Sequence, residues 1–100
     1  MVKIKWTQPA RDDLKAISEY ISRYSKIYAN RLIKSLINTT IKLEKMPYCG
    51  RIVPEVDSYS LREIIHNNYR IVYLVKSNND IDIIRVIHTS RDFKQQEFVC

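Results

Sequence analysis

Three short apolar stretches in the second half of the chain place the strongest constraint on its fold. They occupy Leu61–His66, Tyr69–Lys76 and Ile81–His88, and arginines and histidines stand among their apolar residues. Asn67-Asn68 fits a two-residue hairpin turn because asparagine tolerates positive φ, and Asn78-Asn79-Asp80 supplies a second turn. The segment therefore predicts a three-stranded antiparallel meander from about residue 61 to about residue 88.

The first half of the chain predicts a helix hairpin from about residue 8 to about residue 46. Thr7 is suited to cap a first helix and Ser25 to cap a second, and Met46-Pro47 ends the second because proline cannot continue the hydrogen-bond ladder. Apolar residues recur at steps of three and four. They form two stripes: Ala10, Leu14, Ile17, Ile21 and Tyr24 on the first helix, and Ala29, Leu32, Ile33, Leu36, Thr40 and Leu43 on the second.

Together these elements predict an α+β fold in a single domain over residues 1–100. Val2–Trp6 alternates apolar and basic residues, as a half-buried strand does, and we expect it to join the sheet. The fold is then an N-terminal strand, an antiparallel two-helix hairpin and a three-stranded antiparallel meander, with one small sheet packed on the helices. We expect Pro47–Tyr59 to be a loop.

The net charge of +6 is unevenly distributed. Residues 1–50 carry ten Lys and Arg against four Asp and Glu, whereas residues 51–100 carry seven of each. Much of the excess lies on the outer face of the second predicted helix, in the basic stripe Arg31, Lys34, Asn38, Lys42 and Lys45. The stripe is either a docking surface for an acidic peptide, RNA or DNA, or the ordinary solvated face of an amphipathic helix.

Several classes of function lack support in the sequence. No apolar run is long enough to span a bilayer and the N-terminus lacks the apolar core of a signal peptide, so we expect a cytoplasmic protein without a membrane partner. Glycine-rich phosphate loops, nucleophile elbows and clusters of metal ligands are also missing from the sequence. We therefore predict no metal and no cofactor.

The cationic side chains of the meander are the candidate site. Arg62, Arg70 and Arg85 either line a site for an anion or form a structural ion network with Glu63 and Glu55. Metal-independent RNA cleavage needs a base, an acid and cations that stabilise the charged phosphorane. The first two roles suit His88, His66, Glu55 and Glu63, and the third suits Arg62, Arg85 and Arg91.

The order of many short fragments resembles the RelE/ParE superfamily of toxins from type II toxin–antitoxin modules. The matching features cover about residues 4–93 and are specific as an ordered set. They are Trp6-Thr7, Ala10, Asp13-Leu14, Ile17, Tyr20-Ile21, Pro47, Gly50-Arg51, Val53-Pro54-Glu55, Arg62-Glu63, Tyr69-Arg70-Ile71-Val72-Tyr73, Arg85-Val86-Ile87-His88 and Arg91. The resemblance implies a helix hairpin on a small antiparallel sheet and a cognate antitoxin that wraps the toxin in an oligomeric complex.

Within the superfamily, the chain looks more like the ParE-type or plasmid-stabilisation sequences. RelE-like nucleases with a His-Tyr pair near the end have no match here, since Thr89 follows His88. Several of them also carry a group of lysines before the second strand of the sheet, where the loop of this chain has only Arg51. The resemblance thus implies a growth-inhibiting toxin that acts on DNA gyrase. One alternative is a RelE-like ribosome-dependent mRNA endoribonuclease, with His88, Glu55, Arg62, Arg85 and Arg91 as catalytic residues. Another is a non-toxic relative that only binds its antitoxin.

The resemblance also assigns roles to two groups of residues. Acidic antitoxin segments would suit the basic stripe, so we expect antitoxin binding at Arg31, Lys34, Lys42 and Lys45. Target binding is expected at the cations of the second half, Arg51, Arg62, Arg70, Arg85, His88 and Arg91.

Overall fold

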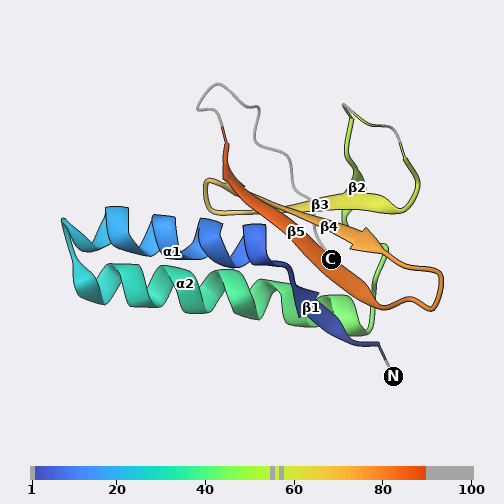
Figure 1. The fold of residues 1–100 in the computed structure, drawn as a ribbon, viewed down its shortest axis with the longest axis horizontal. Helices are drawn as coiled ribbons and strands as arrows, with labels where there is room; N and C mark the ends of the chain where they lie inside the picture. The colour runs from blue at the N-terminus through green and yellow to red at the C-terminus, as the bar shows by residue number, and fades with distance from the viewer. Residues whose placement is uncertain (1, 55, 57, 90–100) are drawn as a thin grey trace.

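The protein folds as a helix hairpin packed on one face of a five-stranded sheet (Figure 1). The computed structural model describes residues 2–54, 56 and 58–89. The elements in chain order are β1 (Ile4–Trp6), α1 (Gln8–Ser22), α2 (Lys26–Ile41), a 3₁₀ turn η1 (Lys42–Glu44), β2 (Arg51–Ile52), β3 (Leu61–His66), β4 (Tyr69–Val75) and β5 (Ile81–His88). None of the helices in the described ranges is long and apolar enough to cross a membrane.

Side-chain caps set the start of both helices. Thr7 Oγ1 accepts a hydrogen bond from the Ala10 N–H, and Ser25 Oγ accepts one from the Tyr28 N–H. These bonds satisfy backbone donors that have no partner inside the helix, and the prediction of both caps is confirmed. Thr7 Oγ1 also donates to Ile83 O at 2.7 Å, so the residue that begins α1 is tied to β5.

The sheet has the order β1-β5-β4-β3-β2. The antiparallel meander of β3, β4 and β5 is confirmed, and Asn67 and Asn79 in its turns have φ values of 56° and 69°. The predicted α+β class and the joining of the N-terminal strand to the sheet are also confirmed, but the sheet is mixed and has one further strand. β1 lies parallel to β5, and the two-residue β2 pairs antiparallel with β3 inside the segment expected to be a loop. Two residues are too few for a periodic sequence signal.

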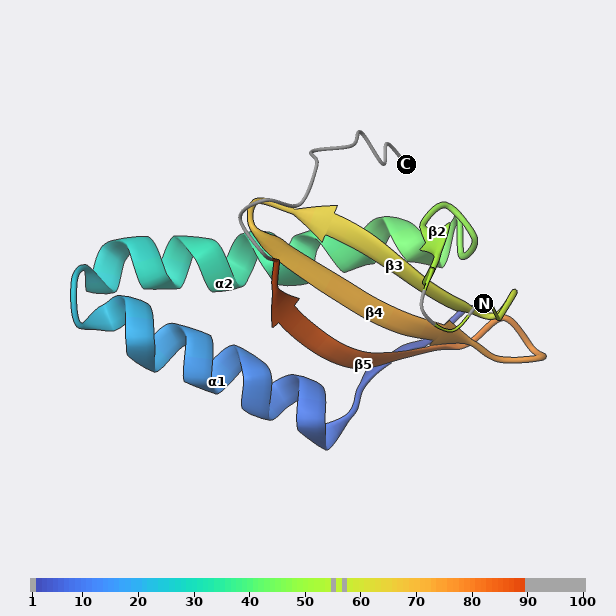
Figure 2. The ribbon, with the colours of Figure 1, turned by 90° about the horizontal axis from the view of Figure 1, so that it is seen from above.

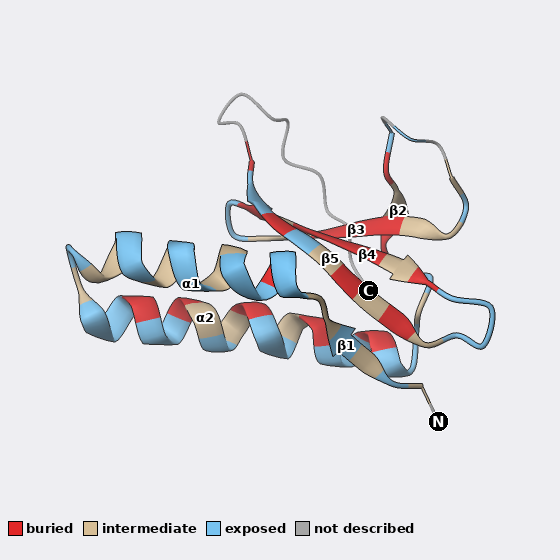
Figure 3. Cartoon of the chain, in the orientation of Figure 1, coloured by how far each residue is buried: buried red, intermediate tan, exposed pale blue. Residues whose placement is uncertain are grey.

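The core lies between the inner faces of the sheet and α2 (Figure 3). It contains Leu32, Leu36 and Leu43 from α2, and Ile71 and Tyr73 from the centre of the sheet. Five of the six residues predicted for the α2 stripe are buried, and the sixth, Ile33, packs against the core from a half-buried position. On α1, Ala10 is the residue that is fully buried.

Gly50 lies where the chain after η1 comes close to β3 and β4, and only glycine fits there. Its N–H donates to the buried Tyr73 hydroxyl at 2.9 Å. A Cβ at this position would lie 2.6 Å from both Glu63 O and the Tyr73 hydroxyl, closer than van der Waals contact allows. Glycine therefore lets the chain after η1 pack against β3 and β4.

The helix hairpin is longer than the sheet that it covers. In both ribbon views the turn between α1 and α2 lies well beyond the end of the sheet at the β3–β4 turn (Figures 1 and 2). Tyr24, which was predicted to be the last residue of the apolar stripe on the first helix, is 75% exposed, so it does not pack with the rest of that stripe. α1 ends at Ser22, and within the described residues no strand lies beneath the turn that holds Tyr24.

Candidate functional site

The structure divides the predicted site residues among three separate clusters. Arg62 contacts the loops that flank β2, Arg51 and Arg70 share Glu63, and Arg85 contacts α1. His88 lies at the end of β5 beside Tyr69. Two predicted site residues, Glu55 and Arg91, lie outside the described residues. The predicted ion network is therefore correct for Arg70 with Glu63, but Arg62 and Arg85 have other partners.

Arg62 is a structural clamp rather than an exposed cation. Its guanidinium donates to three main-chain carbonyl oxygens: Tyr59 O at 2.8 Å, Gly50 O at 3.0 Å and Tyr48 O at 3.3 Å. It also lies 4.5 Å from the ring centroid of Tyr59 and 5.0 Å from that of Tyr48. The residue is only 8% exposed, so this arginine holds the two loops together and presents little charge to solvent.

Glu63 is fully buried and lies between two arginines. Its Oε2 accepts from Arg51 Nε at 2.6 Å, and its Oε1 accepts from Arg70 Nε at 2.8 Å. Adjacent residues of a strand point to opposite faces, so Glu63 occupies the sheet face opposite to Arg62. The carboxylate links β2, β3 and β4 and compensates part of the charge of both arginines.

Asp13 joins α1 to β5. It accepts from Arg85 Nε at 2.7 Å and from Arg85 Nη2 at 3.1 Å, and its Oδ2 also accepts from the Val86 N–H at 2.9 Å. The hydrogen bond and the charge of Asp13 raise the pKa of Arg85 above its ordinary value. β1 pairs with β5 only as far as Ile83, so Asp13 satisfies a backbone donor on the strand edge beyond β1.

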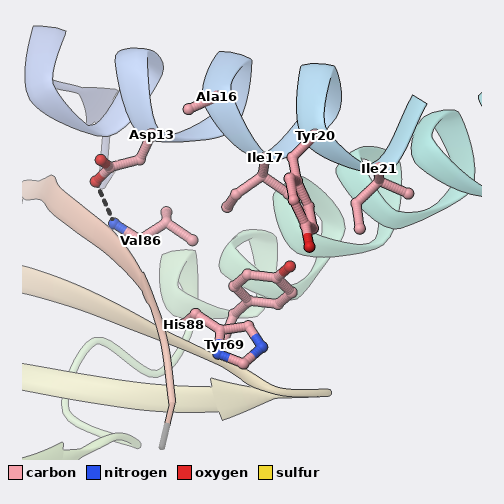
Figure 4. A pocket seen from close by; sticks show the side chains of 8 residues that line it. All are labelled: Asp13, Ala16, Ile17, Tyr20, Ile21, Tyr69, Val86 and His88. Carbon is pink, nitrogen blue, oxygen red and sulfur yellow. Dashed lines mark hydrogen bonds between the residues drawn. The ribbon is translucent and has the colours of Figure 1, made fainter. Parts of the chain in front are cut away.

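A pocket of about 480 Å³ opens between α1 and the ends of β4 and β5 (Figure 4). Asp13 and the apolar residues Ala16, Ile17, Ile21 and Val86 form much of its lining, and Tyr20, Tyr69 and His88 complete it. The rings of Tyr69 and His88 pack edge to face with centroids 5.1 Å apart. Burial, followed by the proximity of Tyr28 and Tyr20, raises the pKa of Tyr69.

The sequence did not predict this pocket, although His88 in its lining was a predicted site residue. Tyr20 and Tyr69 entered only as fragments of the family resemblance. Their juxtaposition depends on how α1 crosses β5, which no local pattern encodes. In the described part of the chain, no three His, Cys, Asp or Glu side chains gather closely enough to hold a metal ion.

His66 lies away from this pocket, under α2. Its Nε2 is 3.1 Å from Ser35 Oγ, and Ser35 Oγ donates its proton to Leu32 O. The imidazole Nε2 is therefore the donor to the serine oxygen. Burial, and to a smaller extent the charge of Lys42, lowers the pKa of His66. This arrangement connects the end of β3 to α2.

The basic stripe of α2 and η1 faces solvent. Arg31, Lys34, Lys42 and Lys45 are all exposed, on the side of the helix opposite to Leu32, Leu36 and Leu43. The prediction that these cations form an outer face is confirmed, and their role in antitoxin binding stays a prediction.

Comparison with known proteins identifies the family. The helix hairpin on a small sheet agrees with what the sequence resemblance implied, although the sheet is mixed rather than purely antiparallel. Over residues 4–93 the chain matches the family described as the ParE toxin of the type II toxin–antitoxin system parDE. The chain belongs to this family of toxins.

Individual relatives carry both ParE and RelE names. The chain is 28% identical over 91 residues to Toxin RelE2 of Caulobacter vibrioides, covering 91% of this chain and 99% of that protein. Its fold is similar to the chromosomal ParDE toxin–antitoxin system from P. aeruginosa, with a TM-score of 0.73, 22% identity, and coverage of 90% of this chain and 98% of that one. It is also similar to the RelBE2 toxin–antitoxin complex from Mycobacterium tuberculosis, with a TM-score of 0.65, 18% identity, and coverage of 87% and 96%.

The contacts of Arg62 predict that this residue stabilises the folded state. Arg62→Ala leaves three carbonyl oxygens without their donor and removes two ring contacts, so we expect a loss of about 3 kcal/mol in the free energy of unfolding. Arg62→Lys keeps the charge without the fork of donors and should lose about half as much. Urea denaturation measures both, with exposed Arg31→Ala as the matched control. Equal stability of Arg62→Ala and the wild-type chain would contradict the clamp.

The lowered pKa of His66 predicts a stability that depends on pH. The folded state releases the His66 proton more readily than the unfolded state, whose ordinary pKa is 6.5, so it binds fewer protons. The stability that the neutral imidazole contributes is therefore fully present above about pH 6.5 and is lost as the pH falls through the pKa of the folded state. Guanidinium denaturation midpoints between about pH 7.5 and pH 5 should fall less steeply for His66→Asn than for the wild-type chain. Identical slopes would show that this imidazole does not contribute.

Proposed function

We propose that this toxin inhibits DNA gyrase, that it thereby arrests growth, and that a cognate antitoxin neutralises it. The family supports the toxin–antitoxin module, and membership of the ParE family in particular favours gyrase over the ribosome. The proposed compartment is the cytoplasm, where the chromosome is supercoiled. A role in plasmid stabilisation follows from the same proposal.

We favour gyrase over mRNA cleavage because the described arginines of the sheet bind groups of the same chain. An RNA-cleaving site needs an acid, a base and cations around one phosphate. Among the described residues, Arg62 holds three carbonyls, Arg51 and Arg70 hold Glu63, and Arg85 holds Asp13. They lie in three clusters on different parts of the sheet, an arrangement that favours recognition of a protein target over phosphate chemistry.

Ribosome-dependent mRNA cleavage is the second candidate because one pocket holds several groups that could transfer protons. His88 lies against Tyr69, and Tyr20 and Asp13 line the same pocket. In this alternative His88 is the general base and a tyrosine hydroxyl the acid, with Arg85 as the nearby cation. The curated relative named RelE2 supports keeping this candidate. The predicted contributions of Glu55 and Arg91 belong to it as well.

Parallel assays on the purified chain distinguish these candidates. We expect inhibition of gyrase supercoiling, DNA damage on expression, and no cleavage of mRNA on programmed ribosomes. The nuclease candidate predicts the reverse pattern, with cleavage lost in His88→Ala and retained in His66→Ala, the matched control outside the pocket. Inactivity in both assays together with harmless expression would contradict both candidates and favour a non-toxic relative that only binds the antitoxin.

The basic stripe supplies a proposal for where the antitoxin binds. Acidic segments of an antitoxin would complement Arg31, Lys34, Lys42 and Lys45, all of which face solvent. Reversing three charges together, Lys34→Glu, Lys42→Glu and Lys45→Glu, should lower antitoxin affinity at least about tenfold at low salt, and less at high salt because ions screen exposed charges. Isothermal titration measures the change, with Lys3→Glu, Lys5→Glu and Lys76→Glu as a control of equal charge. Unchanged affinity would show that the basic stripe is only the solvated face of an amphipathic helix and does not bind the antitoxin.

A further inference from the structure

Both described helices lie on one face of the sheet, and we call the opposite face the outer face (Figure 1). Strand alternation and register place Glu63, Val72 and Ile87 together on the outer face. Glu63 is fully buried between its two arginines, Val72 is 9% exposed and Ile87 is 38% exposed. The outer face therefore carries apolar side chains next to a paired carboxylate, and a further segment that covered them would be stabilised by their burial.

The chain leaves β5 at one end of this face. Thr89 is 7% exposed, and its N–H donates to Asn68 O at 2.7 Å, so the end of β5 is held beside the turn between β3 and β4. Residues 90–100 follow and lie outside the described residues. This segment has two basic and two acidic residues, and its apolar residues other than the terminal cysteine are Phe93, Phe98 and Val99. A segment without net charge and with two phenylalanines is suited to cover an apolar strip.

Cys49 offers an attachment point near the opposite edge of the sheet. It lies half-buried against the core, directly before Gly50 and β2, and it is disulfide-bonded. The sequence contains one other cysteine, which is its last residue, Cys100. The bond therefore joins Cys49 either to the end of the same chain or to a second copy.

The reach of the chain favours a bond within one copy. Three interstrand spacings, about 14 Å, separate β5 from β2. Arg51 pairs with Glu63, which lies three residues, or about 10 Å, before the end of β3 at His66. The direct path is thus about 17 Å, whereas residues 90–100 reach up to about 36 Å when extended. The core and α2 occupy the inner face, so this path runs over the outer face.

We propose that residues 90–100 cross the outer face of the sheet and that a reversible disulfide between Cys100 and Cys49 holds them there. The inference goes beyond the proposed function and does not depend on the cellular target. Glutathione keeps most cytoplasmic thiols reduced, so this disulfide is a redox-sensitive contact rather than a permanent staple. The oxidised chain has a covered outer face, and the reduced chain presents the same face to a partner.

Thiol–disulfide exchange with oxidised glutathione forms the bond. The thiolate of one cysteine attacks a sulfur of glutathione disulfide and releases one glutathione thiolate, which leaves a mixed disulfide. The second cysteine thiolate then attacks the protein sulfur of that mixed disulfide and displaces the second glutathione. Two electrons pass from the two cysteines to the glutathione pair, and their two protons end on the released thiols. Excess reduced glutathione reverses both steps.

Peptide mapping tests the covalent part of the inference. The full-length chain is equilibrated with a mixture of oxidised and reduced glutathione, its remaining thiols are alkylated, and a tryptic digest is analysed by mass spectrometry without reduction. We expect a monomer in which the peptide of residues 46–51 is linked to that of residues 95–100. Cys49→Ser and Cys100→Ser are the controls, and each should abolish the linked peptide. Alkylation of both cysteines at every glutathione ratio, or linkage confined to covalent dimers, would overturn the inference.

The effective concentration of the two thiols tests the path over the outer face. It follows from the ratio of linked to reduced chain at known glutathione concentrations, and we expect a value at least about tenfold higher in native buffer than in denaturing urea. Ile87→Ser removes an apolar contact from the outer face and should lower the native value at least about threefold. Ile41→Ser is the matched control, since Ile41 is 51% exposed on α2, and it should leave the value unchanged. Equal values in buffer and urea, or equal values for the two variants, would contradict docking of the segment on this face.

Discussion

The buried carboxylate of Glu63 binds Arg51 and Arg70, so these two arginines stabilise the sheet. A carboxylate without solvent contact requires compensating donors, and these two guanidinium groups provide them at 2.6 and 2.8 Å. The interaction fixes the short strand β2 against β3 and holds β4 beside them. On the opposite face, Arg62 fixes the chain before and after β2 through three carbonyl oxygens. Two adjacent residues of β3 thus organise the segment between the hairpin and the meander.

A second set of contacts sets the direction of the hairpin relative to the sheet. Thr7 caps α1 and donates to Ile83 O, and less than two turns later Asp13 binds both Arg85 and the backbone of Val86. These bonds hold the first two turns of α1 against β5, while the end of the helix projects past the sheet (Figure 1). The pocket lies where this separation begins. Its position is therefore a consequence of helix length and of the anchoring of one end of α1.

Local interactions explain which parts of the fold the sequence could predict. Helix caps depend on Thr7 and Ser25, and positive φ in the turns depends on asparagine, so each signal lies within a few residues of its effect. The parallel pairing of β1 with β5 joins residues almost eighty positions apart, and no short pattern specifies it. Periodicity extended the apolar stripe of the first helix to Tyr24, but it could not indicate that α1 ends at Ser22 and that the sheet ends before this turn. The predicted site residues were recognised by type, whereas their distribution among three clusters depends on strand register and on the side chains that they meet.

Charge and exposed apolar surface are distributed unevenly between the hairpin and the meander. The meander and its flanking segments carry no net charge in the sequence, and its described arginines bind groups of the same chain. The hairpin carries most of the excess positive charge and, at its projecting end, the exposed side chains of Tyr20, Tyr24, Ile27 and Tyr28. Because the described arginines of the meander already bind groups within the chain, the exposed cations of the hairpin are the charges most available to an acidic partner.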